Sequence, residues 1–336
     1  MSDSQDQIIH ILKDGEFHSG ESLGEALGCS RTAVWKQLQK LEKLGLSIES
    51  IKGVGYRVAG GFELLDADSI RSQVDPMAAR YISELEILKT IDSTNKYARE
   101  KAEVRPCSGA VVMAEQQSAG RGRQGKEWVS PFAANIYLSI VWEFEQGAQA
   151  LEGLSLAVGV AVKCALNRHG INGIQLKWPN DIYIQGKKLG GILLEMIGDP
   201  AGQCSVIVGV GVNLAMPVDQ AATIEQAWTD VATQIKLQQS GAEVVSQPQK
   251  NHIASSLISE IISLLSDFQS KGFSSYRDEW QANDAFYGKQ AMISTPKQSI
   301  IGIVRGVEPN GALRLELESG KIETFIGGEL SLRLFV

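Results

Sequence analysis

The chain has 336 residues, of which 43% are hydrophobic and 21% are charged, and its formal net charge is −7 at pH 7. This length exceeds what one hydrophobic core usually serves, so two or three domains are expected, and the composition argues against a disordered chain. The four cysteines and four histidines show no metal or paired-cysteine spacing, which argues against a structural zinc site or a disulfide framework.

The N-terminus, MSDSQDQIIHILKDGE, is acidic and lacks the basic and long apolar regions of a signal peptide. No apolar run approaches about 18 residues, the length that a membrane span requires. We therefore expect a cytoplasmic protein without a membrane partner.

Charge is divided within the first sixty residues. Residues 1–30 hold six acidic residues against one lysine, whereas residues 31–57 hold six basic residues against two acidic ones. The segment SGESLGEALGCS predicts a helix with Leu23, Ala26 and Leu27 on one face, followed by a turn at Gly28-Cys29. A second helix is expected to begin after Ser30, a good N-cap residue.

The second helix places Val34, Leu38 and Leu41 at helical spacing as a buried stripe. The following segment, LSIESIKGVGYRVA (46–59), predicts a hairpin that turns at residues 52–55. This succession is typical of a winged helix-turn-helix domain that binds DNA; a small helical domain with a solvated basic face is the alternative. The outward side chains of the second helix are Arg31, Thr32, Trp35, Lys36, Gln39 and Lys40. The candidate DNA contacts are Arg31, Thr32, Trp35, Lys36 and Lys40 of this helix and Lys52 of the wing.

A linker is expected at residues 59–61, and the segment ILKTIDSTNKYAREKA (87–102) then predicts a strand running into a helix. Ser93 or Thr94 could cap that helix, and this structural role is sufficient to explain them. Together with Gln117 they also supply the uncharged donors and acceptors that a neutral polar ligand requires.

The segment GRGRQGKEW (120–128) matches two phosphate-binding patterns, G-x-G-x-x-G and G-x-x-x-x-G-K. A strand is predicted before it at 109–117, but Pro131 and the mixed run before it argue against the helix that both motifs need. Glu127 also replaces the Ser or Thr of a P-loop. We therefore interpret the segment as a mobile glycine-rich loop whose Arg121, Arg123 and Lys126 can close over an anion.

The segment GIQLKWPNDIYIQGKKLGGILLEMIG (173–198) predicts a hairpin with Lys177 at its entrance and Lys188 at its tip. Asn180 and Asp181 lie between them, and the strand CSVIVGVGVNLAM (204–216) ends near Asn213. Each residue alone has a structural explanation, as a turn or edge residue. Combined with the arginine loop they indicate a site for a nucleotide and its α-phosphate, which acts by charge stabilisation and positioning.

The segments DSTN, EQQSAGRGRQGKEW, SPFAANIYLS, LKWPNDIYIQGKKLGGIL and VGVGVNLAM together resemble the biotin protein ligase family. With the N-terminal helix-turn-helix, the chain resembles those members that also repress the biotin operon. The resemblance implies an α+β multidomain protein. Its parts would be a winged helix-turn-helix domain (1–60), a central α/β biotin/lipoate ligase-type catalytic domain (68–272) and a C-terminal SH3-like β-barrel (273–336). Alternating strands and turns at 290–334 fit the last part.

The resemblance implies that biotin and MgATP form biotinyl-5′-adenylate and pyrophosphate, and that the biotinyl group then passes to a lysine of a carrier protein. The implied catalytic residues are Arg121, Arg123, Lys177, Asp181 and Lys188, with Asp181 on the magnesium side. The implied biotin-binding residues are Ser93, Thr94, Asn95, Gln117, Arg121, Gly122, Arg123 and Lys188. The implied nucleotide-binding residues are Asn180, Asn213 and Trp228, the last stacking on adenine.

The implied partners are biotin, ATP, the biotin carboxyl carrier protein of acetyl-CoA carboxylase, operator DNA, and a second subunit that pairs once the adenylate orders the loops. Two other functions are weighed: a DNA-binding biotin sensor without ligase activity, and a ligase without DNA binding. A lipoate ligase is the nearest chemical alternative. The segment from Asp230 to Asn251 is longer and richer in glutamine than the family's usual segment.

Overall fold

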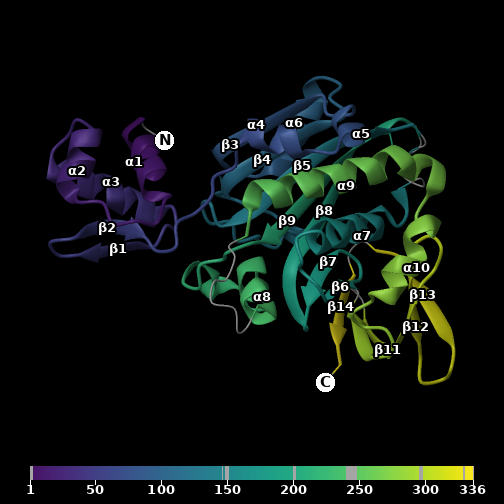
Figure 1. Cartoon of the computed structure of the whole chain (residues 1–336). Coiled ribbons are helices and arrows are strands. Elements are labelled where there is room, and N and C mark those ends of the chain that lie inside the picture. The colour runs from purple at the N-terminus through teal and green to yellow at the C-terminus, as the bar shows by residue number, and fades with distance from the viewer. Residues whose placement is uncertain are drawn as a thin grey trace.

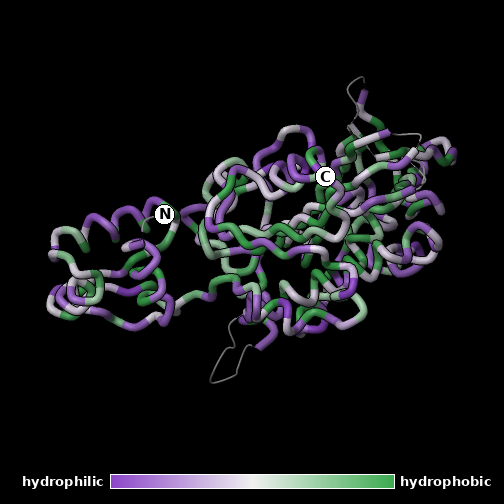
Figure 2. The backbone as a smooth tube through the Cα atoms, turned by 90° about the horizontal axis from the view of Figure 1, so that it is seen from above, coloured by the Kyte–Doolittle hydropathy of each residue, from purple (hydrophilic) through white to green (hydrophobic). Residues whose placement is uncertain are grey.

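A computed structural model of the chain describes residues 3–145, 147, 151–199, 202–239, 248–294, 298–327 and 330–335. Figure 1 shows a small N-terminal domain beside a large sheet domain, with a small β unit at the C-terminal end. The hydrophobic segments in Figure 2 run through the interior of the sheet domain, and hydrophilic segments lie toward its periphery. The three-part architecture expected from the sequence is confirmed.

The N-terminal domain is a three-helix unit with a two-stranded wing. Ser30 caps α3, its hydroxyl accepting a hydrogen bond from Ala33 N, and Val34, Leu38 and Leu41 are buried as predicted. Ile48 to Ile51 pair with Gly55 to Val58 in the antiparallel wing. The elements are α1 (Asp3–Leu12), α2 (Gly20–Ala26), α3 (Arg31–Lys43), β1 (Ile48–Ile51) and β2 (Gly55–Val58).

One prediction for α2 is wrong. Ala26 is exposed, and Gly24 takes a buried position beside Leu23 instead. The carbonyl oxygen of Cys29 approaches so closely that a Cβ on Gly24 would lie 2.8 Å from it. The turn after α2 therefore leaves room only for glycine at position 24 on the buried face of the helix. Helical periodicity alone does not reveal this requirement.

The central domain is built on a seven-stranded sheet of order β3-β4-β5-β9-β8-β7-β6, in which only β3 and β4 are parallel. Its strands are β3 (Glu84–Ile91), β4 (Ala110–Gln117), β5 (Asn135–Phe144), β6 (Ile174–Lys177), β7 (Asp181–Ile184), β8 (Lys187–Gly198) and β9 (Cys204–Asn213). Its helices are α4 (Ala67–Gln73), α5 (Pro76–Ala79), α6 (Thr94–Val104), α7 (Leu154–Asn167), α8 (Val231–Gln238), α9 (Lys250–Lys271) and α10 (Ser274–Ala282), with short 3₁₀ turns η1 (Arg123–Gly125) and η3 (Gln220–Thr223).

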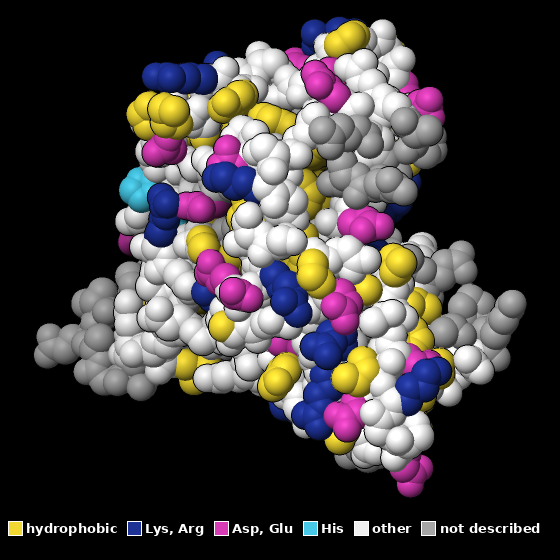
Figure 3. All heavy atoms as spheres, turned by 90° about the vertical axis from the view of Figure 1, so that its right-hand side faces the viewer, with side chains coloured by type: hydrophobic (Ala, Val, Ile, Leu, Met, Phe, Trp, Pro, Cys, Tyr) yellow, Lys and Arg dark blue, Asp and Glu magenta, His cyan; other side chains and the backbone are white. Residues whose placement is uncertain are grey.

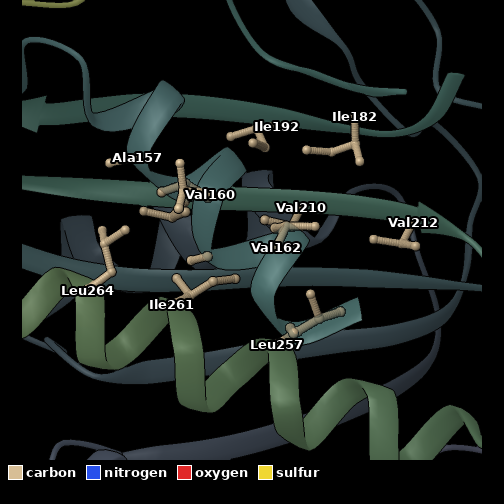
Figure 4. Packing of buried hydrophobic residues seen from close by; sticks show 14 of the residues in the cluster. Ala157, Val160, Val162, Ile182, Ile192, Val210, Val212, Leu257, Ile261 and Leu264 are labelled. Atoms are coloured by element: carbon tan, nitrogen blue, oxygen red, sulfur yellow. The ribbon is translucent and has the colours of Figure 1, made fainter. Parts of the chain in front are cut away.

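The two faces of this sheet have different compositions because side chains alternate along each strand. Figure 4 shows Ile192 of β8 and Val210 and Val212 of β9 on the face that packs against α7 and α9. These residues belong to the main hydrophobic cluster of the protein. The opposite face is covered by α6 at one end, and it carries the polar residues and glycines described below.

The C-terminal unit is a five-stranded antiparallel sheet of order β13-β12-β11-β10-β14. Its strands are β10 (Gln290–Ser294), β11 (Ser299–Val307), β12 (Leu313–Glu316), β13 (Ile322–Phe325) and β14 (Ser331–Leu334). Figure 3, which views the molecule from this side, shows basic, acidic and hydrophobic side chains interspersed over the surface. The small C-terminal β domain expected from the sequence is confirmed.

The C-terminal unit is joined closely to the edge strand β6. Leu176 N donates to Asn283 O at 2.8 Å, and Ala285 N donates to Leu176 O at 2.9 Å. The buried indole of Trp178 donates to Gly311 O at 3.1 Å. The hairpin that carries Lys177 and Asp181 is therefore held in place by residues far along the chain.

A buried ion pair joins the start of α9 to the central sheet. Glu115 of β4 and Lys250 at the start of α9 lie 2.5 Å apart, each with a side chain only 4% exposed. Glu115 also accepts a hydrogen bond from Leu65 N, and Lys250 also donates to Ala133 O. Both charges thus have several partners, as buried charges require.

A carboxyl group at the C-terminal junction lacks a full set of partners. Asp284 Oδ1 accepts from Phe286 N, whereas no described residue donates to its buried Oδ2. Burial raises the pKa of Asp284 to about 6. In the unfolded chain this carboxyl titrates at about 4, so the folded state binds the proton more tightly. Protonation therefore stabilises the folded state at low pH, and this stabilisation is lost as the pH rises through about 6.

Asp284→Asn is therefore expected to raise the melting temperature at pH 8, because it removes a buried charge. The gain over the original chain should shrink steadily as the pH falls from 7 to 5. Thermal unfolding across that range measures this, with Asp278→Asn in the exposed part of α10 as the control. Equal shifts for the two variants at every pH would contradict the assignment.

Within the described residues, no helix is both long and apolar enough to cross a membrane. The four cysteines are free thiols, as expected from their spacing.

Candidate functional site

The site is organised around one row of residues that crosses the sheet on its α6 face. Strand register aligns Lys177, Asp181, Gly191, Gly211, Tyr137 and Ala114, in that order, from β6 to β4. The row is charged at the β6 end, lacks side chains at the two glycines, and is apolar at the β4 end. It can therefore hold an anionic group at one end and an apolar group over its middle.

Trp128 lies over the gap that the two glycines leave. A Cβ on Gly211 would approach the indole to 2.6 Å, and one on Gly191 would approach it to 3.2 Å. The buried indole N–H has no acceptor among the described residues, and the ammonium group of Lys188 lies 5.3 Å from the ring centroid. Trp128 is thus a wall of the site that packs directly on the two glycines, with its N–H against the sheet at Gly211.

Sequence reasoning missed Trp128, Gly191 and Gly211 as site residues. The tryptophan ends the GRGRQGKEW segment, and nothing in that local pattern indicates a place in the site. Its role depends on the pairing of β8 with β9, which a single sequence does not reveal. The prediction that no helix follows the two glycine-rich motifs is confirmed, because only a short 3₁₀ turn follows Gly122 before β5 begins.

A polar network lies where β3 and β4 end. Gln117 Oε1 accepts hydrogen bonds from Thr94 N at 2.9 Å and Thr94 Oγ1 at 3.2 Å, and its Nε2 donates to Ser130 Oγ at 3.0 Å. Ser93 caps α6, with its hydroxyl accepting from Lys96 N. Ser93, Thr94 and Gln117, far apart in the sequence, are therefore brought together.

Asn95 lies deeper in the same network. Its Nδ2 donates to Glu195 Oε2 at 2.8 Å, and its Oδ1 lies 2.7 Å from the Ser139 hydroxyl. A Cβ on Gly209 would lie 2.1 Å from Asn95 Oδ1, so the amide packs directly on the β9 backbone. These contacts give Asn95 a supporting position beneath the network.

The charged end of the row combines one carboxylate with two lysines. Asp181 Oδ1 lies 2.6 Å from Lys188 Nζ, and Asp181 Oδ2 lies 3.3 Å from Lys177 Nζ. Burial alone raises the pKa of Asp181, but the two ammonium groups outweigh burial and hold this pKa below its usual value. The carboxylate is therefore ionised at neutral pH, and the three side chains together carry a positive charge.

Tyr183 lies beside these charges. Lys177 Nζ is 3.3 Å from its hydroxyl oxygen and also lies 5.7 Å from the ring centroid of Phe286, which follows the junction with the C-terminal unit. Burial, with Asp181 nearby, raises the pKa of Tyr183 to about 12. The hydroxyl is neutral at physiological pH.

The two arginines of the glycine-rich loop lie in different environments. Arg123 is half-buried and donates through Nη1 to Asn180 Oδ1 at 3.2 Å; burial lowers its pKa, and the charge of Asp181 opposes that effect. Arg121 is exposed, and Gly122 N donates to Lys126 O at 2.7 Å to close the loop. Arg123 thus connects the loop to the hairpin that carries Asp181.

The segment containing Trp228 attaches to the backbone of Lys188. Lys188 N donates to Ala227 O, and Thr229 N donates to Lys188 O, both at 2.9 Å. Asn213 Nδ2 donates to Thr229 O at 3.1 Å. The structure therefore places Asn213 and Trp228 beside Lys188. Residues 240–247 of the glutamine-rich segment lie outside the described residues.

The candidate DNA contacts form a separate exposed surface. The predicted outward residues of α3 are all exposed, and so is Lys52 at the turn of the wing. The α3 residues are Arg31, Thr32, Trp35, Lys36, Gln39 and Lys40. Arg57 of the wing instead pairs with Glu49 at 2.8 Å and stacks over Phe17. Exposed basic side chains are therefore presented on α3 and at the wing turn.

Three family models match the chain in order. One described as an HTH domain matches residues 4–57, the biotin/lipoate A/B protein ligase family matches residues 87–213, and the biotin protein ligase C terminal domain matches residues 290–333. These matches cover all three parts of the fold.

Full-length relatives agree with these matches. The chain is 40% identical over 327 residues to the bifunctional ligase/repressor BirA of Salmonella typhimurium, covering 97% of this chain and 96% of that relative. It is 30% identical to BirA of Bacillus subtilis, covering 91% of both chains. It also resembles the solved structure of the Aquifex aeolicus biotin protein ligase in complex with biotin and ATP, with 25% identity and a TM-score of 0.62 over 76% of this chain and 100% of that one. The chain belongs to the biotin protein ligase family, and it is a bifunctional ligase and repressor.

Proposed function

We propose that biotin lies along the row against the exposed side of the Trp128 indole, with its ureido group on the polar network of Thr94 and Gln117. The observation that carries this proposal is the row itself, in which the Trp128 indole packs on the two glycines between the charged residues and the polar network, with an N–H that has no acceptor among the described residues. An apolar ring and chain can pack on the indole, and a neutral urea suits the uncharged network. Ser93, Asn95 and Gly122 support this part of the site.

The carboxylate of biotin would then reach Lys188 and Arg123 at the charged end of the row. There its oxygen attacks the α-phosphate of ATP, forming biotinyl-5′-adenylate and releasing pyrophosphate. Lys188, Arg123 and Arg121 stabilise the negative charge that develops on the phosphate oxygens. Asn180, which accepts from Arg123, would bind the nucleotide together with Asn213 and Trp228, which belong to the segments beside Lys188.

Magnesium would enter as part of MgATP, because Mg²⁺ commonly takes one or two protein carboxylates along with substrate phosphates. Asp181 is the carboxylate that the row presents, and its low pKa keeps it ionised for this purpose. Lys177, 3.3 Å from Asp181, would face the departing pyrophosphate.

In the second step, the amine of a carrier-protein lysine would attack the carbonyl carbon of the mixed anhydride and release AMP. The glycine-rich loop and the Trp228 segment shield the adenylate from water until the carrier arrives. We propose the biotin carboxyl carrier protein of acetyl-CoA carboxylase as this acceptor, and the cytoplasm as the place of the reaction.

Transfer of labelled biotin to a purified carrier domain tests the ligase proposal. Label should appear on the carrier lysine only with MgATP present, and without the carrier the enzyme should accumulate bound adenylate. Retention of biotin without pyrophosphate release would instead support a biotin sensor.

We also propose that adenylate-bound chains pair as homodimers, so that two α3 helices meet two operator half-sites. The exposed basic surface of α3 and the wing turn supports contact with DNA phosphates.

Lys36→Gln and Lys40→Gln are each expected to weaken operator binding and to reduce the slope of log affinity against log salt by about 0.9, because one phosphate contact releases about one counterion. Biotin transfer should be unchanged. Fluorescence anisotropy at several salt concentrations measures the slope, with the exposed Lys321→Gln as the charge-matched control. An unaltered slope for both α3 variants would place the DNA surface elsewhere.

A further inference from the structure

A second row of residues crosses the sheet beside the row proposed to hold biotin. Strand register aligns Leu193 of β8, Gly209 of β9 and Ser139 of β5, two residues away along each strand and therefore on the same α6 face. Asn95 of α6 packs on this second row, since a Cβ on Gly209 would lie 2.1 Å from its Oδ1. The half-buried Glu195, two residues beyond Leu193 on β8, reaches the same amide with its carboxylate.

The orientation of the Asn95 amide is fixed by its acceptors. Its Nδ2 lies 2.8 Å from Glu195 Oε2 and 3.3 Å from the Leu193 carbonyl oxygen. A carboxylate and a carbonyl oxygen only accept hydrogen bonds, so the amide nitrogen must face them. Asn95 Oδ1 therefore faces the other way, 2.7 Å from the Ser139 hydroxyl, and accepts from it.

This orientation commits the single hydrogen of the Ser139 hydroxyl. Ser139 Oγ lies 2.7 Å from Asn95 Oδ1 and 2.8 Å from Thr94 Oγ1. The amide oxygen cannot donate, so the Ser139 hydrogen goes to Asn95, and the contact between the two hydroxyl oxygens needs the hydrogen of Thr94 instead. All three side chains are buried, so leaving one of these hydrogen bonds unmade would be costly. The Thr94 hydrogen consequently points toward Ser139.

Thr94 and Gln117 are then left as hydrogen-bond acceptors. The Thr94 hydrogen serves Ser139 at 2.8 Å, and its 3.2 Å contact with Gln117 Oε1 is the weaker branch. The Gln117 amide is fixed separately, because the Ser130 hydroxyl donates to Trp128 O and accepts from Gln117 Nε2. In this arrangement no described residue donates to Thr94 Oγ1. Thr94 Oγ1 and Gln117 Oε1 can therefore both accept from N–H groups of a ligand.

We propose that Glu195 is a positioning residue for ligand recognition, whose carboxylate directs the Thr94 hydrogen away from the ligand through Asn95 and Ser139. The inference rests on the proposed placement of the ureido group of biotin on Thr94 and Gln117. Glu195 does not touch biotin in this assignment. It acts only through the relay of Asn95, Ser139 and Thr94.

Loss of the carboxylate would reverse this relay. With no acceptor at position 195, the Asn95 amide can turn over and donate to Ser139, which then donates to Thr94. The Thr94 hydrogen would then be free to face the site. The site would accept a ligand oxygen there as readily as an N–H group, so Glu195 determines which of the two is recognised.

The test compares the binding of biotin with that of two cyclic carbamate analogues, each with one ureido N–H replaced by a ring oxygen. Isothermal titration calorimetry on the full-length chain gives the dissociation constants without requiring catalysis. The original chain should bind the less favoured analogue about ten- to hundredfold more weakly than biotin, because a ring oxygen leaves a buried acceptor unpaired. Glu195→Met should reduce this ratio to about threefold or less, since the Thr94 hydrogen can then pair with the ring oxygen.

Glu195→Gln keeps an acceptor beside Asn95 and should retain most of the discrimination. Ser139→Ala breaks the relay at its next step and should lower the ratio as Glu195→Met does. Glu143→Met is the matched control, because Glu143 is also a half-buried glutamate on the α6 face but lies near the far end of β5. It should leave the ratio unchanged.

A ratio that Glu195→Met leaves unchanged, or that Glu143→Met lowers equally, would overturn the inference. Equal binding of biotin and both analogues by the original chain would also overturn it, while leaving the proposed biotin site intact. If the original chain does not bind biotin, the proposed function fails first, and the inference falls with it.

Discussion

Lys188→Ala is expected to slow adenylate formation by about 10²- to 10³-fold, the usual effect of removing one preorganised charge-stabilising donor. Lys188 Nζ lies 2.6 Å from Asp181 and 5.3 Å from the Trp128 ring centroid, at the point where the biotin carboxylate and the α-phosphate would meet. Its removal would also leave the buried Asp181 with Lys177 alone, so the pKa of that carboxyl should rise toward its usual range. Biotin-dependent exchange of pyrophosphate into ATP measures this step.

Lys187→Ala provides a control with the same charge change one residue away. Lys187 is exposed at the tip of the β7–β8 hairpin, so its substitution should leave the exchange rate within about twofold, because isolated surface charges contribute little. Lys188→Arg should recover part of the activity, since the charge remains but its geometry differs. Similar rates for Lys187→Ala and Lys188→Ala would remove Lys188 from the catalytic assignment.

Lys250→Met is expected to lower the free energy of unfolding by about 3–5 kcal/mol, because it leaves Glu115 as an uncompensated buried charge. Among the described residues, the hydrogen bond from Leu65 N is what Glu115 would retain. Chemical denaturation at pH 7 measures the change. The double variant with Glu115→Gln should be more stable than Lys250→Met alone, because its buried group is neutral and Gln can still accept from Leu65 N.

Lys271→Met at the other end of α9 is the control. Lys271 pairs with Asp267 in an exposed i,i+4 arrangement, which contributes about 0.3–0.5 kcal/mol. If both methionine variants lose the same stability, the Glu115–Lys250 pair has no special structural importance.

Local patterns were sufficient to predict much of the fold. The helix period identified Val34, Leu38 and Leu41, the N-cap rule identified Ser30, and alternation with a turn identified the β7–β8 hairpin. These features depend on residues within a few positions of one another. The predicted hairpin also places Lys177, Asp181 and Lys188 together at one edge of the sheet. In the structure the two lysines contact Asp181 there.

The remaining features depend on long-range pairing. Gly191 and Gly211 become a gap only when β8 pairs with β9, and only then does Trp128 have a place over them. The Glu115–Lys250 pair joins residues 135 positions apart, and the burial of Phe132 in the N-terminal core crosses a domain boundary. No local periodicity carries such information, because register and docking are set by the assembled sheet.

The contacts that secure β6 set an order in which the chain can become functional during its synthesis. A ribosome releases the helices and wing of the first 58 residues long before Asn283 and Gly311, which hold Leu176 and Trp178 in place. Domains generally fold as units from the N-terminus during synthesis. In a nascent or prematurely terminated chain, the recognition helix would therefore be present while the strand bearing Lys177 still lacked its supports. The DNA-binding part of this protein is thus completed before the ligase part during translation.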